Sequence, residues 1–143
     1  MKISGPILDR IDIQVQVKPL RAHEMIERKS SESSKVIKER ILKARLIQNK
    51  RRVSTGVSFN ARLTPHAIKQ FCQLTGELEN IMVSAVKRYS LSARSYYKIL
   101  KVARTIADLD NRESIARDDI LEALAYREVE QILYSKNELH VSA

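Results

Sequence analysis

Hydrophobic positions along this chain predict a protein built from helices, with one extended segment near its start. From about residue 35 onward, apolar residues recur at spacings of three and four, which is typical of amphipathic helices. Before that point Ile11, Ile13, Val15 and Val17 alternate with polar residues, which is the periodicity of a β-strand. We therefore expect an all-α fold, a bundle of five helices preceded by a single extended segment.

Capping residues set the expected limits of the five helices. Serine, threonine and aspartate favour helix N-termini, proline is tolerated at the first helical position, and glycine ends helices. These rules predict five helices. The first covers 32–51, the second begins at Thr64 and Pro65 and stops at Gly76, and the third begins at Glu77. The fourth runs from the Ser92 cap to about 109, and the fifth from Asp118 to about 135. The polar segments between and after them are predicted to be a linker over 18–34, a loop over 53–63, and a fraying tail.

The first helix is expected to bury one face and expose another. Its apolar stripe consists of Ile37, Ile41, Ala44 and Ile47. The opposite face is cationic, with basic residues every seven positions and three more nearby: Lys38, Arg45 and Arg52, then Lys35, Lys43 and Lys50.

The extended segment has no strand partner in the rest of the sequence. A lone strand can neither hide its apolar edge nor pair its backbone N–H and C=O groups. We therefore expect residues 1–17 to be the remnant of an α/β core, and the chain to be a piece of a larger protein. This segment should be disordered or poorly docked by itself. The helices, in contrast, bury enough large side chains, at ~1.5–3 kcal/mol each, to hold together.

Composition narrows the function classes. The chain has 143 residues, with 26 lysines and arginines against 17 aspartates and glutamates, for a net charge of +9. This excess favours a polyanionic partner such as a nucleotide or nucleic acid, although a solvated cationic surface explains it equally well. There is neither a long apolar run nor a signal peptide, so we expect no membrane partner and a cytoplasmic location. The single cysteine, Cys72, lies on an apolar stripe and is expected to be a buried structural thiol.

The sequence holds no complete active site. Its glycines at positions 5, 56 and 76 are too dispersed for a phosphate-binding loop. The histidines at 23, 66 and 140 lie far apart, and no metal-ligand cluster or catalytic triad can be argued. We expect that this chain alone neither hydrolyses ATP nor binds it tightly, and that it holds no metal.

Two arginines and a lysine are the candidate site residues. Arg10 lies in a turn just before the extended segment, where a guanidinium could reach a phosphate bound by a neighbouring subunit. Arg94 lies two residues after the Ser92 cap, where a helix N-terminus favours an anion and a basic residue is unfavourable without one. The same helix continues with basic residues on roughly one side, a candidate phosphate-facing ridge: Lys98, Lys101 and Arg104.

Each of these assignments has a plainer alternative. Arg10 can be an ordinary exposed arginine that pairs with Asp9 or Asp12. Arg94 and the ridge can form a solvated helix face. The residues by themselves leave both alternatives open.

Four stretches carry a resemblance to a known family. Residues 91–109, LSARSYYKILKVARTIADL, are similar to the lid-helix signature of magnesium chelatase-like AAA+ ATPases of the ComM/YifB type. Residues 122–127, EALAYR, resemble the last helix of that family, and residues 60–63, NARL, its mid-lid loop. Residues 4–13 resemble the segment before the last core strand of the related AAA+ ATPases. The family commonly has alanine and histidine where this chain has Ser95 and Tyr97.

The resemblance implies roles for the candidate residues. It implies that Arg10 is an arginine finger acting in trans, and that Arg94 is the sensor-2 arginine that contacts ATP phosphate from the lid. Lys98, on the ridge, is a further candidate phosphate contact. The resemblance also implies ATP and Mg²⁺ as cofactors of a longer parent protein, and a ring of subunits, commonly a hexamer. The expected division of the chain is a core remnant over 1–17, a linker over 18–34, a helical lid over 35–137 and a tail over 138–143.

Three functions remain open at this point. ComM-type proteins are associated with DNA processing, which suits the cationic first helix and makes DNA a candidate partner. A stand-alone basic helical module that binds nucleic acid also suits the net charge, although few aromatic residues and no recognition helix are present. The third is a subunit of a true porphyrin magnesium chelatase.

Overall fold

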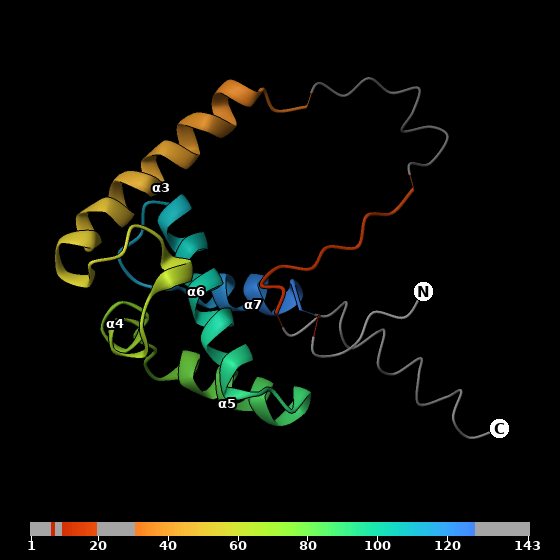
Figure 1. Cartoon of the computed structure of the whole chain (residues 1–143). Coiled ribbons are helices and arrows are strands. Elements are labelled where there is room, and N and C mark those ends of the chain that lie inside the picture. Colours follow the sequence, from red (N-terminus) through yellow and green to blue (C-terminus); the bar gives the residue numbers. More distant parts are fainter. Residues whose placement is uncertain (1–6, 8–9, 20–30, 128–143) are drawn as a thin grey trace.

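The computed structural model describes residues 7, 10–19 and 31–127, and within them the fold is a bundle of five α-helices (Figure 1). The helices, with one 3₁₀-helix named η1, are α3 (Ser34–Thr55), η1 (Asn60–Arg62), α4 (Pro65–Phe71), α5 (Glu77–Tyr89), α6 (Ala93–Leu109) and α7 (Arg117–Ala125). The predicted all-α class is therefore confirmed.

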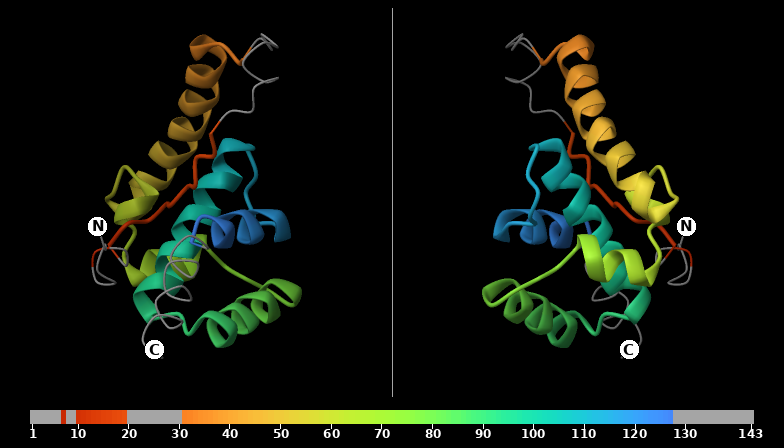
Figure 2. Two further views of the ribbon diagram at one scale, coloured as in Figure 1. Left: turned by 90° about the vertical axis from the view of Figure 1, so that its right-hand side faces the viewer. Right: turned by 90° about the vertical axis from the view of Figure 1, so that its left-hand side faces the viewer.

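The centre of the bundle is α6, against which α3, α4 and α7 pack (Figures 1 and 2). Its apolar positions recur every three or four residues, and the inward ones are at most 3% exposed: Ile99, Leu100, Ala103 and Ala107. Met82 of α5 and Ile120 of α7 are buried in the same core. Because this stripe runs along most of α6, the position of that helix sets how α3, α4 and α7 pack around the core.

Side-chain caps start α4 and α6 where the sequence predicts. Thr64 Oγ1 accepts a hydrogen bond from the Ala67 N–H at 3.2 Å, and Ser92 Oγ accepts one from the Ser95 N–H at 3.1 Å. Each bond satisfies one of the N–H groups that the first turn of a helix leaves unpaired. Both predicted starts are confirmed.

Two predicted helix ends are wrong because the backbone, rather than the apolar pattern, decides where a helix stops. The second helix, α4, ends at Phe71, and Gly76 instead caps the start of α5 with a φ of 56°. The first helix, α3, continues to Thr55 and ends where Gly56 adopts a left-handed φ of 71°. Glycine enters this region without the steric cost that a Cβ atom brings.

The last helix is also shorter than predicted. Ala125 is the final residue of α7, and Tyr126 leaves the helix, so a continuous helix to residue 135 is wrong. The part of the predicted helix over 128–135 lies outside the described residues. The physical consequence is a turn at 126–127 that directs Arg127 back toward α6.

The N-terminal half of α3 projects beyond the rest of the bundle (Figures 1 and 2). Ala44 is buried as predicted, but Ile37 and Ile41 are 38% and 48% exposed, so the predicted stripe is wrong for these two residues. The reason is length: 22 residues of helix span about 33 Å, which is longer than the 17 residues of α6 that it packs against.

Cys72 is buried, as predicted, with 3% of its surface exposed. Burial raises the pKa of its thiol to about 11, against the opposing effect of the Arg104 and Arg51 charges. Because the thiolate is the reactive form of cysteine, Cys72 is an inert part of the core.

The extended segment does not form a strand. A strand requires backbone pairing with a neighbouring strand, and none is present in the described part of the chain. The segment instead passes beside α6 (Figure 2), and the Gln14 N–H donates to the Tyr126 carbonyl at 2.9 Å. This bond attaches the backbone of the segment and Gln14 is buried, but the four apolar residues stay exposed, as the expected poor docking implies: Ile11 at 40%, Ile13 at 52%, Val15 at 64% and Val17 at 88%.

Candidate functional site

Arg94 lies in the first turn of α6 and is exposed to solvent. Ser92 caps this turn, which contains no acidic residue. The leading N–H groups of the helix and its dipole create a positive potential, so this end of α6 favours an anion. The structure thus confirms the position of Arg94 after the Ser92 cap, and its sensor-2 role stays a prediction.

Lys98, one turn after Arg94, contacts the N-terminal segment. Its Nζ lies 2.9 Å from Oδ1 of Asp12, and the lysine side chain is 12% exposed. A phosphate that approached this lysine would have to compete with the Asp12 carboxylate. The predicted phosphate contact of Lys98 stays a prediction.

The predicted ridge is wrong for Arg104, which is only 1% exposed. Lys101 Nζ donates to the Ala61 carbonyl at 2.9 Å in a contact open to solvent, and its place on the ridge stays a prediction. A spacing of three residues drifts around a helix of 3.6 residues per turn, so positions 98 and 104 point about 120° apart. The drift carries Arg104 from the outer face of α6 into the core.

Arg10 lies in an exposed turn, and its backbone N–H donates to the Ile7 carbonyl at 3.0 Å. The plainer alternative for Arg10 was an ion pair with Asp12 or Asp9. In the structure Asp12 pairs with Lys98 instead, and Asp9 lies outside the described residues. The role of Arg10 as an arginine finger stays a prediction.

Arg127 joins the segments that carry the two candidate arginines. Its Nη1 donates to the Ile11 carbonyl at 3.1 Å, and its Nη2 donates to Ser95 Oγ at 3.3 Å. Ile11 follows Arg10 in the chain and Ser95 follows Arg94. No signal in the sequence marked Arg127 beyond its place in the EALAYR stretch, because periodicity does not identify a buried arginine.

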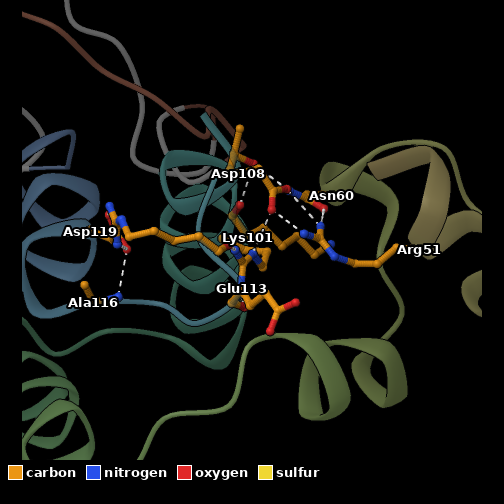
Figure 3. A network of polar contacts seen from close by, with 10 residues as sticks. Arg51, Asn60, Lys101, Asp108, Glu113, Ala116 and Asp119 are labelled. Carbon is orange, nitrogen blue, oxygen red and sulfur yellow. Dashed lines mark hydrogen bonds and ion pairs between the residues drawn. The ribbon is translucent and has the colours of Figure 1, made fainter. Parts of the chain in front are cut away.

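A buried network of ionic and polar side chains joins α3 to α6 (Figure 3). The Asp108 carboxylate, 0% exposed, accepts hydrogen bonds from Arg51 of α3, from Arg104 at 3.1 Å, and from Asn60 of η1 at 2.7 Å. Arg104 also donates to the carbonyls of residues 112–113. Desolvation lowers the pKa of Arg104, and the Asp108 charge opposes that shift. The network holds α3 at a defined position on α6.

A second buried carboxylate starts α7. Asp119 is 1% exposed and accepts the Ala116 N–H at 2.8 Å, which caps the helix. Arg112 donates two hydrogen bonds to Asp119, each 2.6 Å long, and these raise the pKa of Arg112. The acidic start of this helix is as predicted, but its arginine partner lies in a turn that carried no such signal.

The described residues supply only part of what a nucleotide site needs. They provide cationic side chains at the start of α6, but no group of three or more His, Cys, Asp and Glu residues that could hold a metal ion. Nor do they contain a helix whose length and apolar character would allow it to cross a bilayer.

Comparison with known families identifies the class of this bundle. The family model described as magnesium chelatase, subunit ChlI C-terminal, matches residues 31–127, a range that includes all five α-helices. The chain therefore belongs to the magnesium chelatase ChlI C-terminal family, and the resemblance seen in the sequence is confirmed.

Similar proteins occur in several bacteria. The protein YifB of Escherichia coli is 36% identical over 134 residues, which cover 92% of this chain and 26% of YifB. The competence protein ComM of Haemophilus influenzae is 35% identical over 134 residues, which cover 92% of this chain and 25% of ComM. The protein Rv2897c of Mycobacterium tuberculosis is 31% identical over 127 residues, which cover 89% of this chain and 25% of Rv2897c. The chain thus spans about a quarter of the length of these relatives.

Proposed function

We propose that this chain is the C-terminal helical lid of a ComM-type AAA+ ATPase, which contributes to ATP hydrolysis in a cytoplasmic ring of subunits that processes DNA. The observation that carries the proposal is the exposed Arg94 at the capped N-terminus of the central helix. Membership of the family supports the class of protein, and similarity to a competence protein supports the role in DNA processing.

The two arginines act on charge in this proposal. During phosphoryl transfer, negative charge develops on the phosphate oxygens, and fixed guanidinium groups stabilise it. Arg94 would contact the nucleotide held between the core of its own subunit and this lid, and Arg10 would contact the nucleotide of the next subunit in a hexameric ring. ATP and Mg²⁺ would be bound by the core of the longer protein, with Lys98 available to phosphate once Asp12 releases it.

Replacing Arg94 by alanine in the full-length protein should lower kcat for ATP hydrolysis about 10²-fold, the cost of losing one preorganised donor to a transition state. The helix content and urea midpoint of the 143-residue chain should stay at wild-type values, because Arg94 is exposed. Arg88→Ala, another exposed arginine, at the end of α5, is the matched control and should keep wild-type turnover. Wild-type turnover of Arg94→Ala would contradict the sensor role.

The exposed cationic residues along α3 favour a second function, binding of nucleic acid by this chain itself. Most of its basic side chains are exposed to solvent: Lys35, Lys38, Lys43, Lys50 and Arg52. Arg45 is the exception on the predicted cationic face, because its guanidinium lies 4.0 Å from the centre of the Phe59 ring. A row of exposed cations along a projecting helix is suited to contact with a phosphate backbone.

Fluorescence anisotropy with labelled duplex and single-stranded DNA at several salt concentrations measures this binding. If α3 contacts phosphates, the double variant Lys38→Gln/Arg52→Gln should reduce the slope of log K against log salt by about 2, because each phosphate contact contributes about 0.9. The control variant Lys87→Gln/Arg88→Gln removes the same amount of charge from α5. It should change the slope of log K against log salt less, because only the net charge of the chain is altered. Absence of binding at low salt would exclude the function.

A further inference from the structure

Arg127 makes two contacts that a core arginine does not need for packing alone. The residue is 5% exposed, and its two terminal nitrogens reach different parts of the chain, the Ile11 carbonyl and Ser95 Oγ. The planar guanidinium presents its donors in a fixed fork, so one side chain sets the separation of both acceptors. The turn before Arg127 is itself tied to the same segment, through the Gln14 N–H and the Tyr126 carbonyl.

A second link joins the same two elements without Arg127. The ion pair between Lys98 and Asp12, at 2.9 Å, connects α6 to the N-terminal segment one turn further along the helix. Asp12 is two residues after Arg10, and Lys98 is four residues after Arg94. Two contacts of different chemistry therefore hold the Arg10 turn against the first two turns of α6.

Both acceptors of Arg127 lie next to the candidate arginines. Ser95 also accepts a hydrogen bond from Ser92 Oγ at 3.2 Å, so it belongs to the capped turn that carries Arg94. A displacement of this turn, such as the release of a phosphate would cause, changes the position of Ser95 and hence of Arg127. Arg127 passes that change to Ile11, which is bonded to Arg10.

We propose that Arg127 is a positioning residue that couples the first turn of α6 to the Arg10 turn, so that the nucleotide state sensed by Arg94 in one site alters the placement of Arg10 in the next site. The coupling rests on the proposed function, which assigns Arg94 and Arg10 to different nucleotides. Arg127 touches neither nucleotide in this scheme and acts through its contacts with Ile11 and Ser95.

Amide hydrogen exchange on the 143-residue chain tests whether Arg127 holds the N-terminal segment against α6. The Gln14 amide, bonded to the Tyr126 carbonyl, should exchange at least about tenfold faster in Arg127→Ala, while the Ala103 amide in the centre of α6 should exchange at the wild-type rate. Arg127→Lys should not restore the wild-type rate, since an ammonium group cannot span both acceptors. Arg117→Ala removes an exposed arginine at the other end of α7 and should change neither amide.

Asp12→Asn is a second variant, which can be measured even if Arg127→Ala unfolds the chain. Asp12 is 54% exposed in its side chain, so its replacement leaves the core intact, and the Gln14 amide should exchange about two- to fivefold faster, the range for an exposed ion pair. A Gln14 exchange rate that neither variant changes would overturn the coupling.

ATP turnover of the full-length protein tests whether this contact couples neighbouring nucleotide sites. Arg127→Ala should lower kcat and the Hill coefficient for ATP while KM stays within about twofold, because the residue links sites and does not bind nucleotide. An unchanged Hill coefficient in a variant with accelerated Gln14 exchange would overturn the proposal. If the full-length protein shows no ATP turnover, the proposed function fails, and the exchange experiment alone then decides whether the two turns are coupled.

Discussion

Replacing Arg10 by alanine in the full-length protein is expected to lower ATP turnover by about 10³- to 10⁵-fold, the range for arginine fingers in other phosphoryl-transfer enzymes. Arg10 lies in an exposed turn whose following residues are held against α6 and α7. Because the residues after this turn are held in place, the backbone at Arg10 is positioned in advance, and the side chain is ordered when it meets a phosphate of the adjacent subunit. Nucleotide affinity should change far less than kcat, because an arginine finger stabilises the transition state more than the ground state.

Mixing subunits distinguishes action in trans from action in the same subunit. Rings assembled from Arg10→Ala and Arg94→Ala subunits should regain part of the turnover. In some sites the subunit that holds the nucleotide then has an intact Arg94, and its neighbour supplies an intact Arg10. Arg40→Ala is the matched control, because Arg40 is an exposed arginine of α3 whose partner, Glu32, is an exposed residue just before that helix. Equal loss of nucleotide affinity and kcat in Arg10→Ala, or mixed rings as inactive as the variants alone, would contradict the finger role.

The largest expected effect on stability comes from Asp108→Ala, which should lower the free energy of unfolding by about 3–5 kcal/mol. Asp108 is 0% exposed and Arg104 is 1% exposed, so removal of the carboxylate leaves a buried guanidinium without its counter-charge. Arg51 would lose the same partner, and with it the main ionic link between α3 and α6. Urea unfolding of the 143-residue chain, followed by circular dichroism, measures the change.

Asp110→Ala is the matched control for this experiment. Asp110 lies two residues away, but its side chain is 58% exposed and its ion pair with Arg112 is open to solvent. The expected loss for such a pair is about 0.2–1 kcal/mol. Equal destabilisation by Asp108→Ala and Asp110→Ala would show that the buried network does not hold the bundle together.

Local signals in the sequence were sufficient for much of the helical framework. Ser92 and Thr64 started their helices as predicted, because a cap satisfies backbone N–H groups within three residues and needs no distant partner. The apolar stripe of α6 was also predicted from periodicity, since a helix with one apolar face must bury it. Arg94 followed from the same logic, as a basic residue just after a cap.

The errors occurred where a distant residue decides the outcome. Arg104 has the same spacing pattern as an exposed ridge residue, and its burial is favourable only because the Asp108 carboxylate and the 112–113 carbonyls accept its hydrogen bonds. Ile37 and Ile41 have the pattern of buried residues, but the bundle does not extend far enough to cover them. The N-terminal segment has strand periodicity, yet its backbone pairs with the end of α7.

The sequence by itself determined the all-α class, the family, most helix starts and the candidate arginines, because caps, periodicity and short motifs act over a few neighbouring residues. Only the tertiary structure decided which charges are buried and which segments meet. Asp108 accepts a hydrogen bond from Arg51, which is 57 positions away in the chain, and Arg127 donates one to the Ile11 carbonyl, which is 116 positions away. Such contacts depend on how the helices pack, and packing places residues together whose separation along the chain carries no signal.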